Sequence, residues 1–202
     1  MIKYVIFDVM GVIFTVGDDV EGMLIPYIRS IKPDIDPKDI KGKYLNASLG
    51  KISSHELWTQ FGFTAADIPA IERNYLEKSF TLDAGFLPCA NTLKARYHIA
   101  LLSNDILEWS IFLRRFHGIE PIVDAAFISS DLGYRKPDPE IYRIALDKLD
   151  AKPSECIFID DYPGRVEVAR ELGIVSILFD REGHDYNGLR VKSFKQLEQL
   201  LI

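Results

Sequence analysis

Short apolar runs recur along the chain, and longer stretches between them repeat apolar positions every three or four residues. Runs rich in Val, Ile and Phe are typical of strands buried on both faces of a parallel sheet. The predicted strands span residues 2–7, 98–102, 125–128, 156–159 and 175–179. Between the later runs, the spacing predicts helices over 139–149 and 165–172. This alternation predicts an α/β fold, a doubly wound parallel sheet.

One long segment interrupts the alternation. From about residue 18 to residue 79 there is no convincing buried strand, and helix-like pieces are separated by prolines and glycines. Within it, Ser53 and Glu56 have the spacing of a capping box. We therefore expect an inserted α-helical domain over 17–81, joined to an α/β core formed by 1–16 and 82–202. Gly17 and Gly85 lie near the two joints and are candidate hinges.

Composition narrows the class of partner. Of the 202 residues, 48% are hydrophobic and 27% are charged, which is typical of a folded globular protein. A net charge of −6 argues against nucleic-acid and anionic-membrane surfaces, and favours a small-molecule partner. Met1 leads almost directly into a strand, without a signal region or an apolar run of membrane-spanning length, so we expect a cytoplasmic protein. The sequence does not indicate an oligomeric state.

The two cysteines have no metal-type spacing. Cys89 and Cys156 are interpreted as free thiols, with a single disulfide as the alternative.

Polar residues that could take part in catalysis or ligand binding follow the predicted strands. Asp8 comes directly after the first strand, Ser103 and Asn104 follow the second, and Asp160 and Asp161 follow the strand at 156–159. Lys136 lies in a proline-stiffened loop before a helix. The carboxyl ends of parallel strands share one edge of a sheet, where α/β proteins bind ligands. Adjacent acids at such an edge are costly unless a cation neutralises them.

In that order, Asp8, Ser103, Lys136 and the pair Asp160-Asp161 resemble the four motifs of the haloacid dehalogenase (HAD) superfamily. The commonest members of that superfamily are magnesium-dependent phosphatases. The resemblance spans nearly the whole chain, and the helical insertion matches the cap that many members place between the first and second motifs. The segments 135–139 and 158–164 look like the capped subgroup that includes sugar phosphatases and the phosphatase domain of soluble epoxide hydrolases.

The resemblance implies a hydrolase that acts on a small phosphorylated metabolite. Asp8 would attack phosphorus and form an aspartyl-phosphate, which water then releases. Lys136 would be the catalytic cation. Phosphoryl oxygens would be held by Lys136, Ser103 and Asn104, together with backbone amides of Met10 and Gly11.

The resemblance also implies a Mg²⁺ cofactor. Its ligands would be Asp8, the backbone carbonyl of Met10 and Asp161, with Asp160 behind them and out of direct contact with the metal. Oxygen ligands of this kind suit Mg²⁺.

Met10 departs from the family pattern. Most phosphatases of the family have an aspartate two residues after the nucleophile, which protonates the leaving oxygen and then activates water. Met10 can do neither, although its carbonyl can still bind a metal. General acid–base help is worth roughly 10²–10⁴ in rate, so its loss slows catalysis without necessarily ending it.

Three interpretations follow. The first is a phosphatase that acts on substrates with good leaving groups, or that recruits another acid from a set of candidates near or in the insertion: Asp18, Asp19, His55 and Glu56. The second is a dehalogenase-like or phosphonatase-like hydrolase, since halide leaves without a proton and a cap lysine can form a Schiff base; the candidate lysines are Lys41, Lys43 and Lys51. The third is a non-catalytic binding protein with the same fold.

Two further interpretations concern charged and polar residues near the candidate site. Arg135 is interpreted as a solvated or cap-facing charge, and the loop that carries His184 and Asp185 as surface at the rim of a strand end.

Overall fold

The computed structural model describes residues 1–202, and one sheet of six parallel strands forms its centre. The order of strands is β3-β2-β1-β4-β5-β6. Their bounds are β1 (Tyr4–Phe7), β2 (His98–Ser103), β3 (Ala125–Ile128), β4 (Cys156–Asp160), β5 (Val175–Phe179) and β6 (Arg190–Val191). This confirms the predicted α/β fold with its five apolar strands. The sixth, β6, was not predicted, because it has only two residues and no apolar run.

Helices cover both faces of the sheet, because alternate residues of a strand point to opposite faces. In β1, Val5 and Phe7 face a large apolar cluster that also contains residues of α5 and α10, whereas Ile6 faces a second cluster shared with α8 and α9. The helices of the core are α5 (Phe86–Leu93), α6 (Leu107–Phe116), α7 (Ser129–Leu132), α8 (Pro139–Lys148), the short 3-10 helix η2 (Pro153–Glu155), α9 (Pro163–Glu171) and α10 (Phe194–Leu201).

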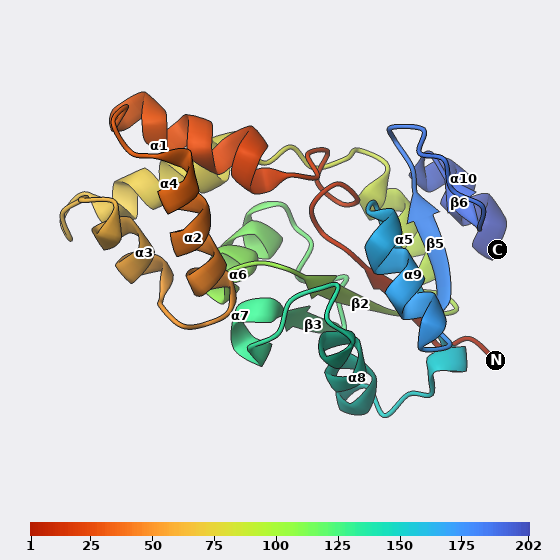
Figure 1. Ribbon diagram of the computed structural model, residues 1–202. Coiled ribbons are helices and arrows are strands. Elements are labelled where there is room, and N and C mark those ends of the chain that lie inside the picture. The colour runs from red at the N-terminus through yellow and green to blue at the C-terminus, as the bar shows by residue number, and fades with distance from the viewer.

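The segment between β1 and α5 is helical and contributes nothing to the sheet. It contains the π-helical turn η1 (Val20–Leu24), α1 (Ile25–Ile31), α2 (Pro37–Ser48), α3 (Ser54–Gln60) and α4 (Ile68–Ser79). Figure 1 shows α1 to α4 gathered on one side of the molecule. Ser53 caps α3, and Glu56 completes the capping box that its spacing predicted. Division of the chain into a core and a separately folding cap stays a prediction.

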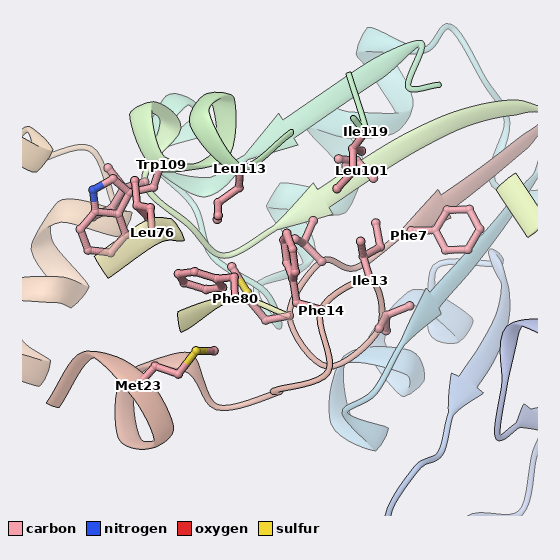
Figure 2. Close-up of a cluster of buried hydrophobic side chains, with 14 of the residues drawn as sticks. Phe7, Ile13, Phe14, Met23, Leu76, Phe80, Leu101, Trp109, Leu113 and Ile119 are labelled. Atoms are coloured by element: carbon pink, nitrogen blue, oxygen red, sulfur yellow. The ribbon is translucent and has the colours of Figure 1, made fainter. Parts of the chain in front are cut away.

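The larger apolar cluster joins these helices to the sheet. Phe14 and Phe80 lie between Phe7 of β1 and Trp109 of α6, as Figure 2 shows. The rings of Phe14 and Phe80 meet edge to face with centroids 5.6 Å apart. Aromatic contacts of this geometry add to the stabilisation that burial provides. The helical segment is therefore packed continuously onto one face of the core.

Both cysteines are buried free thiols, as the sequence favoured. None of the helices combines the length and the apolar composition needed to cross a membrane.

Candidate functional site

Three adjacent strands end at the candidate site. Phe7, the last residue of β1, is level with Leu101 of β2 on one side and with Ile159 of β4 on the other. Asp8 therefore emerges between the ends of β2 and β4, which terminate at Ser103 and Asp160. Because all three strands are parallel, their following residues lie on one edge of the sheet.

Lys136 lies between two buried carboxylates. Its Nζ is 2.7 Å from Asp8 Oδ1 and 2.7 Å from Asp160 Oδ2. The lysine and Asp160 side chains have 0% exposure, and the Asp8 side chain has 2%. A carboxylate is strongly disfavoured in such a place unless a cation and hydrogen bonds compensate for lost water. Lys136 is thus the group that allows two acids to lie side by side.

Asn104 holds the backbone of that lysine in place. Its side-chain amide donates to the carbonyl of Lys136 (2.8 Å), and its Oδ1 accepts from the Lys136 backbone N–H (2.7 Å). This geometry favours a positioning role for Asn104 over the direct phosphate contact expected from the sequence. Ser103 differs, since its buried Oγ has no hydrogen-bond partner within the protein. A buried hydroxyl without a partner is rare and marks a place where a ligand oxygen fits.

Arg165 brings a second cation to the same acids. Its Nη1 lies 3.4 Å from Asp8 Oδ2, 3.4 Å from Asp160 Oδ1 and 3.8 Å from Asp161 Oδ1. Its guanidinium also lies over the ring of Tyr162, 5.4 Å from the ring centroid. The site therefore contains three acids and two cations.

Burial and these charges set the protonation of the acids. Burial, together with the charge of Asp160, raises the pKa of Asp8 to about 6. Burial, then Asp8 and Asp160, raises the pKa of Asp161 to about 8. Burial also opposes ionisation of Asp160, but Lys136 and Arg165 outweigh it and lower the pKa of Asp160. Asp160 is the acid most firmly held as a carboxylate.

The turn after Asp8 is built on glycine and braced by an arginine. Gly11 has φ +82°, and a Cβ there would lie 1.9 Å from Asp161 Oδ2. Only glycine adopts this conformation and allows so close an approach. Arg181 donates to the carbonyls of Gly11 (3.0 Å) and Val12 (2.9 Å), and pairs with Asp83 at 2.8 Å.

Met10 is an apolar filler in this turn. Its side chain is 4% exposed and belongs to the larger apolar cluster. A thioether offers no proton to a leaving group.

A cleft of about 520 Å³ lies next to these acids, and Asp161 is the one that lines it. Only three of the fourteen residues that line it are hydrophobic. Its charged residues come from several elements and are Asp18, Asp19, Arg135, Asp161, Arg165, Arg181 and Glu182. His184 also lines this cleft, in agreement with the rim position expected for its loop, and its Nδ1 lies 3.0 Å from Asp180 Oδ1. Such a lining suits a polar, charged ligand.

Among the candidate acids, Asp19 lines this cleft and accepts a hydrogen bond from a tyrosine side chain. The hydroxyl of Tyr44 in α2 donates to Asp19 Oδ2 at 2.9 Å. Burial raises the pKa of Asp19 to about 6, while the Tyr44 hydrogen bond and the charge of Arg135 act in the opposite direction. Arg135 faces the helical segment, since it hydrogen-bonds Ser48 at the end of α2.

The other candidates for proton or Schiff-base chemistry are less well placed. Asp18 lines the cleft but is exposed, and it accepts from the backbone N–H of Glu21 at 2.9 Å. The carboxylate of Glu56 is used in the capping box of α3, and neither it nor His55 lines the cleft. The candidate lysines also lie outside the lining; they are Lys41, Lys43 and Lys51.

Sequence reasoning missed Arg165 and Arg181 as site residues. Arg165 was taken as the start of a helix, but α9 begins at Pro163 and places this arginine within its first turn. A cation there is opposed by the helix dipole, so its position is a signal that another charge holds it. Arg181 follows β5 at the same sheet edge, which is the signal that applied to the acids.

The acids fit a divalent cation. Asp8, Asp160 and Asp161 each offer a carboxylate oxygen, and these oxygens lie within 4.8 Å of one another. All are hard oxygen donors, which Mg²⁺ prefers. The space around Asp161 is also narrow. A Cβ on Gly11 would lie 1.9 Å from Asp161 Oδ2, and a Cβ on Gly17 would lie 2.3 Å from it.

Among characterised proteins, the chain is similar to a D-ribitol-5-phosphate phosphatase of Bacteroides thetaiotaomicron. The two are 27% identical over 184 residues, which cover 86% of this chain and 89% of the relative.

Solved structures share the fold. A HAD family enzyme from Bacteroides thetaiotaomicron, in complex with magnesium and inorganic phosphate, matches with a TM-score of 0.72 at 20% identity, covering 92% of this chain and 98% of that one. A 2-haloacid dehalogenase from Pseudomonas syringae pv. Tomato DC3000 matches with a TM-score of 0.68 at 18% identity, covering 100% and 98%. At these identities the likeness establishes the fold.

Residues 2–173 match a family model of hydrolases, the haloacid dehalogenase-like hydrolases. The chain therefore belongs to the haloacid dehalogenase-like hydrolase family.

Proposed function

We propose that the protein is a magnesium-dependent phosphatase of small, polar phosphorylated metabolites, with Asp8 as the nucleophile. The observation that carries this proposal is the position of Asp8, which Lys136 holds beside Asp160 and near Asp161, the acid that lines the polar cleft. The similarity to a sugar-alcohol phosphate phosphatase along most of the chain supports it.

The chain supplies the attack and the binding of phosphate. Lys136 holds Asp8 Oδ1, and Oδ2, which faces Arg165 at 3.4 Å, attacks phosphorus while the bond from phosphorus to the ester oxygen breaks. The Ser103 hydroxyl binds a phosphoryl oxygen. Water then attacks phosphorus, the bond to Asp8 breaks, and inorganic phosphate leaves. Division of one displacement into two lowers the barrier of each.

Asp8, Asp161 and the Met10 carbonyl would hold the Mg²⁺, with Asp160 kept behind them by its ion pair with Lys136. When bound, the ion would offset the repulsion between an attacking carboxylate and an anionic phosphate.

Asp19 supplies the proton that Met10 cannot. It lines the cleft, and Tyr44 orients its carboxyl group. In the first step it donates to the leaving oxygen, and in the second it accepts a proton from the attacking water. A group whose pKa is raised to about 6 is suited to both roles near neutral pH.

The test is a panel of phosphate monoesters with leaving groups of graded basicity, assayed with Mg²⁺. For the wild type we expect turnover of sugar and polyol phosphates and a shallow dependence on leaving-group pKa. Asp8→Asn should abolish turnover. Asp19→Asn should make the dependence steep, because the leaving oxygen then departs without a proton. Asp18→Asn is the matched control, since Asp18 is the exposed neighbour in the same cleft.

Three outcomes oppose all or part of the proposal. Equal inactivity of the wild type and Asp8→Asn across the panel would favour the non-catalytic alternative. Release of halide from a 2-haloacid without added metal would favour the dehalogenase alternative. A steep profile already present in the wild type would remove Asp19 from the mechanism and leave Asp8 in it.

A further inference from the structure

The two cations at the acids differ in how firmly they are held. Lys136 is 0% exposed and its backbone is fixed by Asn104. The Arg165 side chain is 23% exposed and lines the cleft. Lys136 is thus fixed in the interior beside the acids, whereas Arg165 approaches them from the cleft.

Arg165 contacts the same three residues that fit a divalent cation. One nitrogen, Nη1, lies within 4 Å of a carboxylate oxygen of Asp8, Asp160 and Asp161. With all three acids ionised, as metal ligands must be, Lys136 and Arg165 together would leave one negative charge. Without Arg165, two negative charges would remain, which matches the charge of Mg²⁺. A divalent ion is attracted less to the first arrangement than to the second.

The ring of Tyr162 offers the Arg165 guanidinium a second favourable contact besides the acids. The Tyr162 side chain is 56% exposed, and Arg165 already lies over its face at 5.4 Å. An arginine stacked on an exposed ring keeps a favourable cation–π contact after it leaves an anion. Movement of this side chain toward solvent is therefore less costly than movement of Lys136.

We propose that Arg165 is a built-in competitor of the divalent metal: it offsets part of the negative charge of Asp8, Asp160 and Asp161 in the metal-free protein and withdraws when the ion binds. This inference rests on the proposed metal site, and concerns how weakly that site binds its ion. Because coupling between two ligands is reciprocal, a metal that displaces Arg165 binds more tightly once Arg165 is removed.

The test is direct binding of Mn²⁺, followed by its electron paramagnetic resonance signal, with Mg²⁺ as displacer. Arg165→Gln keeps much of the side-chain length and removes the charge. We expect it to tighten Mn²⁺ binding by roughly 5–150-fold, the usual range of coupling between two sites. Arg170→Gln is the matched control, because it removes the same charge from the same helix, where Arg170 pairs with Glu167 away from the acids. Its affinity should stay that of the wild type.

Equal or weaker binding by Arg165→Gln would overturn the inference, as would an equal gain in Arg170→Gln or no binding by any of the proteins. Should Arg165→Gln fail to fold, the wild type provides a second measurement. Addition of Mg²⁺ should shift the ¹⁵N signal of the Arg165 side chain and leave that of Arg170 unchanged; an unmoved Arg165 signal in the metal-bound protein would contradict competition. These readouts do not use turnover, so failure here is distinguishable from failure of the proposed phosphatase activity.

Discussion

Single residues at the strand ends carry most of the proposed chemistry, and burial explains why each needs its neighbours. Asp8 and Asp160 both form an ion pair with Lys136, and all three side chains are almost fully buried. Asp8, Ser103, Asp160 and Asp161 could be predicted from the sequence because each follows an apolar run. Arg165 could not be predicted in the same way, because its role depends on the distance between the first turn of α9 and the end of β1.

Lys136→Met should destabilise the fold as well as the site. It would leave Asp8 and Asp160 buried together without their shared cation. Removal of one partner of a buried ion pair costs about 3–5 kcal/mol. We expect a loss of this order in the free energy of unfolding, measured by urea denaturation. The triple variant in which Asp8→Asn and Asp160→Asn accompany Lys136→Met should recover much of that loss. No recovery would show that the lysine is not there to balance these charges.

Asp19 predicts a pH dependence whose sign follows from its pKa. Burial raises the pKa of Asp19 above its ordinary value to about 6, and the groups that face it are Asp18, Tyr44 and Arg135. An acid must be protonated to donate, so for substrates with poor leaving groups Asp19 should produce a limb of the pH profile in which the rate falls as pH rises through about 6. In Asp19→Asn this limb should disappear and kcat should fall by roughly 10²–10⁴. An unchanged pH profile in the variant would assign the limb to another group.

Helices and strands can be predicted from the sequence more readily than side-chain contacts, because they follow from local patterns. The parallel strands were predictable because burial on both faces demands continuous apolar runs, and α3 because its capping box is local. The edge strand β6 was not, since its two residues pair only through the backbone with β5. The turn between β1 and the helical segment depends on Gly11, whose close contact with Asp161 is made across 150 residues of sequence.

Two glycine substitutions should have opposite effects. Gly11→Ala forces a Cβ against Asp161 at a residue with φ +82°, and should cost about 1–3 kcal/mol of stability along with activity. Gly42→Ala, on the exposed face of α2 with no atom within 4 Å of the new Cβ, should stabilise by about 0.5–1 kcal/mol. Thermal unfolding of both variants gives the comparison. Equal behaviour would show that the turn after Asp8 tolerates side chains.

Across the whole molecule, one carboxylate links the helical segment to the core. Trp58 of α3 and Trp109 of α6 both donate their indole N–H groups to Glu72 Oε2 of α4, each at 2.7 Å. Their ring centroids are 5.9 Å apart. The shared acceptor joins residues 58, 72 and 109, and no local pattern in the sequence reveals such a contact.

Glu72→Ala should therefore weaken the association of the helical segment with the core. Each buried indole left without an acceptor costs about 1–3 kcal/mol. Glu77→Ala in the same helix breaks only an i,i+4 ion pair with Arg73, worth about 0.3–0.5 kcal/mol. In the wild type, tryptophan fluorescence and far-UV circular dichroism should report one coincident unfolding transition. Separate transitions in the wild type would mean that residues 17–81 unfold independently of the core.

The central claim is that Asp8 carries the phosphoryl group. It is tested most directly by mixing the enzyme with Mg²⁺ and a phosphate ester that it hydrolyses, quenching in acid during turnover, and sequencing the N-terminal peptide by mass spectrometry. We expect one phosphoryl group on Asp8 in the wild type, an increased amount in Asp19→Asn with a good leaving group, and none in Asp8→Asn. Turnover with no phosphoryl group on Asp8, or continued hydrolysis by Asp8→Asn, would contradict the account.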